Sequence, residues 1–196
     1  YIYDHSVHIG GASKWWLEKS LNSLDISLNH KKSKLFYFQG SPKDVIFNII
    51  SQLNITHVFW NRLYDSYSIK RDLEIKQKLI SKKIFCKSYR SLVIKEPWNI
   101  KNKSGSFFKV FTPFWNNCLR EMVEIKLLNS PKKISLPNEE LNFKNREIKN
   151  IKLFPKKSNW TKMLNDFWEP GEKKAIKVLN VFKKSILDNY ADGRDR

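Results

Sequence analysis

Short apolar runs alternate with longer amphipathic stretches along the first half of this chain, and that alternation limits the folds open to it. The runs resemble strands and lie at residues 1–3, 34–38, 56–60 and 84–86. The stretches between them carry apolar side chains three and four positions apart, as amphipathic helices do, at residues 12–28, 41–53 and 68–83. Apolar strands that alternate with helices predict a parallel sheet covered by helices on both faces. The predicted fold class is therefore α/β, with a Rossmann-like sheet.

The pattern changes after about residue 92. Loop signals come first, and residues 112–124 are then predicted to form a helix. Residues 129–158 are rich in proline, lysine and asparagine, which is typical of a linker that lies over a surface. Two further helices are predicted at residues 160–167 and 172–190, the second with an apolar stripe on one side.

The chain is strongly basic, with 37 Lys and Arg against 19 Asp and Glu in 196 residues, a formal net charge of +18. Lysine supplies most of this charge and Asn and Ile are also abundant, a bias that an AT-rich coding sequence produces without any nucleic-acid partner. The charge is spread along the whole chain, so composition alone does not assign a nucleic-acid-binding function. It does predict that binding to any polyanion weakens as salt is added.

Composition also argues against several classes of protein. No apolar run approaches the roughly 20 residues that cross a bilayer and no signal peptide opens the chain, so we expect a cytoplasmic protein with no membrane partner. Cys86 and Cys118 cannot build a disulfide scaffold, and a reducing compartment is expected. Neither they nor the four histidines have the spacing of a metal site, so no metal is predicted.

Three local features are candidates for chemistry, and each also has a structural explanation. The Gly10-Gly11 pair ahead of a helix could offer backbone N–H groups to an anion, although helix capping explains it better. Asp65 and Asp72 have no acid–base partner in the sequence and suit a solvated helix start. The Trp15-Trp16 pair can place only one indole in the core, which leaves the other able to line a cleft. Spacing alone predicts no self-contained active site.

Four sequence blocks carry a more specific signal. They are G-G-A-S-K-W-W-L at residues 10–17, W-N-R with R-D at 60–62 and 71–72, V-F-T-P-F-W at 110–115, and P-G-E at 170–172 followed by Tyr190 and Arg194-Asp195. In this order the blocks resemble the photolyase/cryptochrome family over nearly the whole chain. The first block is most similar to that of bacterial DNA photolyases that repair cyclobutane pyrimidine dimers.

The resemblance implies a domain organisation. Residues 1–128 would form the antenna-binding α/β domain, residues 129–160 the interdomain linker, and residues 161–196 the first helices of an all-α FAD domain. A first strand is expected before Tyr1 and the rest of the FAD domain after Arg196. The implied activity of the whole protein is that of a deoxyribodipyrimidine photolyase, a lyase that uses light to transfer an electron from reduced FAD and split pyrimidine dimers in UV-damaged DNA. This segment would hold the antenna, with no catalytic residue of its own.

The resemblance also implies roles for individual residues. Tyr190 matches a tyrosine that contacts FAD, and Arg194 matches an arginine that contacts DNA; packing at a helix end and a favourable helix dipole explain them structurally. Asp4, Trp15 and Trp16 are predicted to hold the antenna chromophore. Methenyltetrahydrofolate is the expected antenna and a deazaflavin is the alternative, since the family's deazaflavin binders have an acidic residue matching Asp4.

Two other functions stay open at this point. The same fold could serve a cryptochrome-like blue-light receptor, in which a signalling partner replaces DNA repair. It could also be a stand-alone α/β protein that binds a chromophore or a nucleotide. We expect a monomer in each case.

Overall fold

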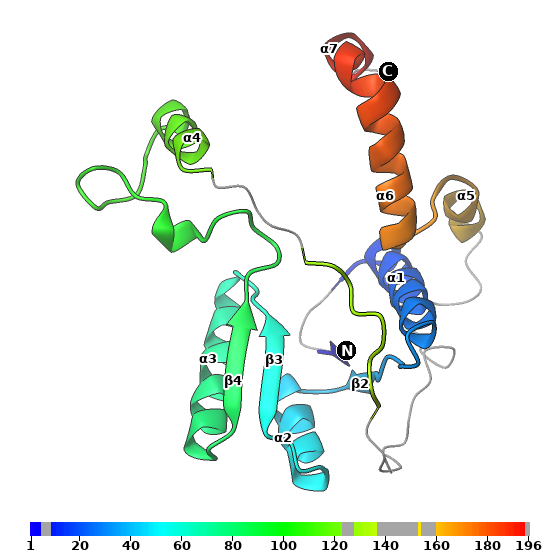
Figure 1. The fold of residues 1–196 in the computed structure, drawn as a ribbon, viewed down its shortest axis with the longest axis vertical. Helices are drawn as coiled ribbons and strands as arrows, with labels where there is room; N and C mark the ends of the chain where they lie inside the picture. Colours follow the sequence, from blue (N-terminus) through cyan, green and yellow to red (C-terminus); the bar gives the residue numbers. More distant parts are fainter. Residues whose placement is uncertain (5–8, 123–127, 137–152, 154–159, 195–196) are drawn as a thin grey trace. The chain divides into compact units, whose positions relative to one another are not determined.

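The computed structural model describes residues 1–4, 9–122, 128–136, 153 and 160–194 (Figure 1). Its strands are β1 (Ile2–Tyr3), β2 (Phe38–Gln39), β3 (His57–Asn61) and β4 (Phe85–Tyr89). Its α-helices are α1 (Gly11–Asn29), α2 (Pro42–Gln52), α3 (Ser66–Ser81), α4 (Phe111–Arg120), α5 (Trp160–Phe167), α6 (Glu172–Val181) and α7 (Tyr190–Gly193). The chain divides into two compact units: the first unit is Tyr1–Val45 with Ser130–Arg196, and the second unit is Ile46–Asn129.

In the second unit, β3 and β4 form a parallel pair that α3 connects (Figure 1). Val58 pairs with Cys86 in the register of the two strands. On α3, Ile75 and Leu79 are buried, with 4% and 0% of their surface exposed. This strand–helix–strand order confirms the prediction from the alternating pattern.

The start of α3 is fixed by a side chain. Asp65 caps the helix, because its carboxylate accepts a hydrogen bond from the backbone N–H of Ser68 at 2.8 Å. The bonds from Ser68 favour the ionised carboxylate and lower the pKa of Asp65 below its ordinary value. The structural explanation that the sequence offered for Asp65, a helix start, is confirmed.

Side chains alternate in burial along both strands of the second unit. The exposed side carries aromatic rings, with Phe59 and Phe85 54% and 53% exposed. Their ring centroids lie 6.1 Å apart, and His57 lies 5.2 Å from Phe85. The sequence predicted strands that are apolar throughout, and their outward-facing rings form a ladder across the pair.

In the first unit, β1 and β2 are parallel and pair Ile2 with Phe38. The core of this unit is small and forms around α1, with Leu21, Tyr37 and Leu153 at its centre. The mixed α/β class with parallel strands and helices, predicted from the sequence, is confirmed. The domain boundaries implied by the resemblance stay a prediction, and most of the linker at 129–160 lies outside the described residues.

A close approach between α1 and the turn before α6 requires a glycine in the first unit. Gly171 has φ +131°, a conformation that side chains rarely adopt. A Cβ built on it would lie 2.3 Å from Oγ of Ser23 on α1. The G of the P-G-E block is therefore a packing requirement.

Two predicted elements differ from what is observed. The strand predicted at 34–38 is reduced to Phe38–Gln39, and the N–H of Leu35 donates to the Asp25 side chain at 2.8 Å. The carbonyl of Phe36 accepts from the nitrogen of Tyr1 at 2.6 Å and the N–H of Phe38 donates to the carbonyl of Tyr1 at 2.9 Å, so the two segments are still paired as far as residue 36.

The predicted helix at 172–190 is not uniform. α6 passes into a π-helical turn, η3 (Phe182–Ile186), then a 3₁₀ turn, η4 (Leu187–Asn189), before α7. The hydroxyl of Ser185 donates to the carbonyl of Val181 at 2.9 Å and competes with the backbone for that acceptor.

Candidate functional site

The first turns of α1 place the two adjacent tryptophans in different environments. Trp15 is 4% exposed, whereas Trp16 is 43% exposed. Their ring centroids lie 6.1 Å apart, with the ring planes at 60°. Gly10 is the N-cap of the helix, and its carbonyl accepts from the N–H of Lys14 at 3.0 Å. The prediction that one indole is buried and the other is not is confirmed, and a cleft lined by Trp16 stays a prediction.

A third tryptophan, which the sequence reasoning did not single out, contacts this pair. Trp168 follows α5 and meets Trp16 edge to face, with ring centroids 5.8 Å apart. Beside it a cavity of about 540 Å³ lies between α1 and the α5–α6 turn, with Lys19 and Lys173 in its lining. The only sequence signal was that Trp168 stands just before the P-G-E block, which begins at Pro170.

The other predicted site residues lie elsewhere in the first unit. Asp4 directly follows β1 and is partly buried, and the residues after it, 5–8, lie outside the described part of the chain. Tyr190 begins α7, is 50% exposed, and contacts Phe182 edge to face at 5.7 Å. Arg194 ends that turn, where its N–H donates to the carbonyl of Tyr190 at 3.0 Å. Tyr190 and Arg194 are thus brought together on one short helix.

The W-N-R block forms a partly buried polar network at the carboxyl ends of β3 and β4. Arg62 donates to both the carbonyl and the hydroxyl of Ser88 at 3.1 Å, and it forms an ion pair with Glu96. The Tyr64 hydroxyl donates to the other oxygen of Glu96 at 2.9 Å. The guanidinium of Arg62 also lies over the ring of Trp98, 5.4 Å from its centroid.

This network shifts the pKa of Tyr64. Burial, together with the hydrogen bond and the negative charge of Glu96, raises the pKa of the Tyr64 hydroxyl above its ordinary value. Sequence reasoning interpreted Glu96-Pro97-Trp98 only as a loop signal and did not identify Tyr64, Ser88 or Glu96. Their partners are distant in sequence, so no local pattern could have shown them.

The rest of this block is also satisfied internally. The indole N–H of Trp60 donates to Asp72 at 3.1 Å, and Arg71 donates to the other carboxylate oxygen at 2.7 and 2.9 Å. Asp72 therefore joins β3 to α3. We conclude that the W-N-R…R-D block stabilises the second unit, and it is not assigned to ligand binding.

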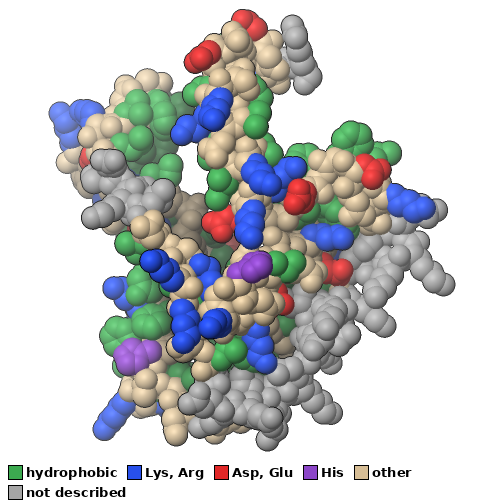
Figure 2. Space-filling view, turned by 45° about the vertical axis from the view of Figure 1, so that its right-hand side comes forward, with side chains coloured by type: hydrophobic (Ala, Val, Ile, Leu, Met, Phe, Trp, Pro, Cys, Tyr) green, Lys and Arg blue, Asp and Glu red, His purple; other side chains and the backbone are tan. Residues whose placement is uncertain are grey.

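Lys and Arg outnumber Asp and Glu in this chain, 37 to 19. Lys and Arg side chains are scattered over the face shown in Figure 2. Within the described residues, no helix combines the length and the apolar character needed to cross a bilayer.

Parallel strands joined by helices define the class of this chain as an α/β domain with a helical extension. The sequence model described as DNA photolyase matches residues 1–133. The deoxyribodipyrimidine photo-lyase of Agrobacterium fabrum is 33% identical over 196 residues, which is 100% of this chain and 40% of that protein. Cryptochrome-2 of Arabidopsis thaliana is 31% identical over 194 residues, covering 93% of this chain and 30% of the relative.

The solved structures give the same result. A crystal structure of a bacterial class III photolyase from Agrobacterium tumefaciens matches with a TM-score of 0.90 and 34% identity, over 100% of this chain and 40% of that one. The chain belongs to the DNA photolyase family. It spans about 40% of the length of the bacterial photolyase that it matches.

Proposed function

We propose that this chain is the N-terminal, antenna-holding part of a deoxyribodipyrimidine photolyase that repairs cyclobutane pyrimidine dimers in UV-damaged DNA. The observation that carries the proposal is the similarity to bacterial photolyases along the entire chain, in sequence and in fold. Reduced FAD, held mainly by the helical domain, would supply the electron when it is bound. The protein is proposed to act as a cytoplasmic monomer.

The exposed end of α1 supports an antenna site. Trp16 and Trp168 present aromatic surface to solvent, and the neighbouring cavity carries Lys19, Lys173 and Glu169, whose carboxylate forms an ion pair with Lys174 at 3.3 Å. A planar, negatively charged chromophore suits such surroundings, because indoles stack on flat rings and lysines attract carboxylates. Methenyltetrahydrofolate has both properties and is our first choice over a deazaflavin. Trp15 would hold the helix in place from within, and Asp4 would lie at the same end of the unit.

The α7 turn supports the roles of the last two residues. Half of the Tyr190 surface is exposed, so its ring and hydroxyl are accessible to a flavin. Arg194, one turn further, is proposed to contact a DNA phosphate near the lesion. FAD and DNA would then approach the same end of the helix.

The central experiment assays the native gene product that contains this chain. UV-irradiated oligothymidylate is incubated with the purified protein in blue light or in darkness, and dimers are counted by chromatography. Loss of dimers in light alone is the expected result. A flavoprotein that absorbs blue light without any loss of dimers would favour the cryptochrome-like receptor, which the similarity to cryptochrome-2 keeps as second candidate.

The antenna is tested separately in the same protein. Trp16→Ala should lower the near-UV absorbance per FAD while repair under saturating light continues. Trp115→Ala is the matched control, because Trp115 has a similar exposure of 46% but lies in the second unit, outside the Arg62 network. Equal absorbance per FAD in both variants would show that the antenna lies elsewhere. For DNA, Arg194→Gln should weaken binding to irradiated DNA more than Lys184→Gln does.

A further inference from the structure

The last helical segment of the first unit is interrupted between α6 and α7, and two aromatic rings meet there. Phe182 and Tyr190 are eight residues apart, which corresponds to a rise of about 12 Å along a straight α-helix. Their ring centroids nevertheless lie only 5.7 Å apart. Between them the backbone departs from regular helical angles, with φ −117° at Ile186 and φ −110° at Asn189. The contact between the two rings therefore depends on the turns that join α6 to α7.

Two hydrogen bonds define the first of these turns. The N–H of Leu187 donates to the carbonyl of Phe182, five residues earlier, as in a π-helix. The hydroxyl of Ser185 donates to the carbonyl of Val181 at 2.9 Å. Phe182 therefore belongs to the turn through its backbone and contacts Tyr190 through its side chain. A change of the Phe182 side chain removes the ring contact and leaves the backbone acceptor in place.

The Phe182 ring restricts the Tyr190 side chain. The two ring planes stand at 80°, an edge-to-face arrangement that aromatic pairs favour. Phe182 is partly buried, whereas half of the Tyr190 surface is exposed. An exposed side chain that is already held in one conformation loses less entropy when a ligand immobilises it. The Tyr190 ring is thus prepared for a partner while its exposed half stays accessible.

We propose that Phe182 is a positioning residue for FAD, which holds the Tyr190 ring in the conformation that contacts the cofactor. The inference rests on the proposed role of Tyr190 and adds a residue on which that role depends. Phe182 acts only through Tyr190, so loss of its ring should weaken FAD binding only while Tyr190 is present. The energy of one aromatic pair corresponds to about a twofold to tenfold change in affinity.

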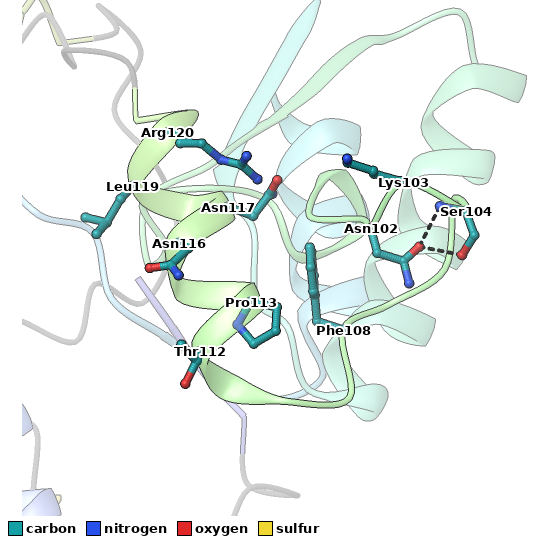
Figure 3. A pocket seen from close by; sticks show the side chains of 10 residues that line it. All are labelled: Asn102, Lys103, Ser104, Phe108, Thr112, Pro113, Asn116, Asn117, Leu119 and Arg120. Carbon is teal, nitrogen blue, oxygen red and sulfur yellow. Dashed lines mark hydrogen bonds between the residues drawn. The ribbon is translucent and has the colours of Figure 1, made fainter.

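A second aromatic pair of similar geometry provides a control. The ring centroids of Phe108 and Phe114 lie 6.2 Å apart, with the ring planes at 72°. Phe108 lines the hollow between α4 and the loop before it (Figure 3), and both residues are partly buried, as Phe182 is. This pair belongs to the second unit. Phe114→Leu therefore removes an equivalent ring contact that does not involve Tyr190.

The FAD affinity of the native gene product that contains this chain tests the proposal. FAD is removed, the apoprotein is titrated with FAD in the dark, and the dissociation constant is measured from flavin fluorescence. Tyr190→Ala and Phe182→Leu should each raise the dissociation constant, the latter by about twofold to tenfold. Phe182→Tyr keeps an aromatic ring at this position and should restore the wild-type affinity. Phe114→Leu should leave the affinity unchanged.

A double variant separates positioning from a general loss of packing. In a chain that already carries Tyr190→Ala, Phe182→Leu should cause no further loss of FAD affinity, because both changes remove the same interaction. A purely structural role of Phe182 would weaken FAD binding equally in both backgrounds and would refute the proposal. If Phe182→Leu does not fold, Phe182→Met takes its place, since methionine is flexible enough to fill the space of the ring.

The outcomes also distinguish this inference from the proposed function. If Tyr190→Ala leaves the dissociation constant unchanged, the FAD role of Tyr190 is wrong and the role of Phe182 falls with it. If Tyr190→Ala weakens binding while Phe182→Leu does not, the inference alone is overturned. The dimer-repair assay decides the photolyase assignment independently of either result.

Discussion

The W-N-R block of the second unit and the aromatic block residues of the first unit differ in how their side chains are used. In the second unit, the Arg62 network satisfies its polar groups with one another, and Glu96 is only 9% exposed. In the first unit, Trp16, Trp168 and Tyr190 leave 43%, 58% and 50% of their surfaces open. A satisfied network holds a fold together, whereas exposed aromatic rings cost solvation and favour a partner. The W-N-R block thus stabilises its unit, whereas Trp16, Trp168 and Tyr190 present aromatic surface.

The largest effect is expected from replacing Arg62, which tests whether its network stabilises the second unit. Arg62→Ala leaves the carboxylate of Glu96 without its ion-pair partner and should lower the free energy of unfolding by roughly 2–4 kcal/mol, less than for a fully buried pair because Arg62 is partly exposed. Urea unfolding measures the change. Lys95→Gln breaks the more exposed ion pair with Glu121 and should change the free energy of unfolding much less. Similar costs for the two variants would contradict a stabilising network.

The packing of the first unit is tested at the turn before α6. Gly171→Ala places a Cβ against Ser23 in an unfavourable backbone conformation and should cost about 1–3 kcal/mol. Gly193→Ala is the control, because a Cβ there meets nothing within 4 Å and alanine suits a helix. Thermal melting followed by circular dichroism compares the two. A melting temperature of Gly171→Ala equal to the control would show that α1 and the turn can separate freely.

A smaller effect is expected at the start of α3. Asp65→Ala removes the helix cap and should cost about 1 kcal/mol. Because the pKa of Asp65 is lowered in the folded chain, its charged form adds stability above the ordinary carboxyl pKa, and this is lost as the pH falls through the folded value. Asp65→Asn should keep the cap and remove this part of the pH dependence. If stability falls with decreasing pH in the same way in the wild type and in Asp65→Asn, the Asp65 carboxylate does not contribute to the pH dependence.

The smallest effect concerns Tyr64. Since its pKa is raised, the neutral phenol is favoured in the fold, and its stabilising effect is present below the ordinary tyrosine pKa and lost as the pH rises through the folded value. The difference in absorbance at 295 nm between the wild type and Tyr64→Phe should show a phenol that ionises above the pH typical of tyrosine. Ionisation at the typical pH would place Tyr64 outside the network.

Local patterns predicted much of the fold and less of the site. Residues 160–167 were predicted as a helix and form α5, because their periodicity is determined by adjacent residues. The strand at 34–38 is shorter than predicted, and the N–H of Leu35 donates to Asp25, ten residues before it. Glu96 and Trp168 were missed because each gains its role from a partner distant in sequence. The different burial of Trp15 and Trp16 was predicted correctly, because helix geometry alone points adjacent side chains in different directions.

The π-helical turn at Phe182–Ile186 changes the direction in which the side chains after it leave the helical segment. A π turn accommodates an additional residue, and one residue corresponds to about 100° of rotation in an α-helix. Tyr190 and Arg194 therefore point in a direction that an uninterrupted 3.6-residue repeat from Glu172 would not give them. Deleting one residue from this turn would leave composition and charge almost unchanged, yet rotate both side chains about a quarter of a circle. The directions of the Tyr190 and Arg194 side chains therefore depend on the number of residues in this turn as well as on which residues form it.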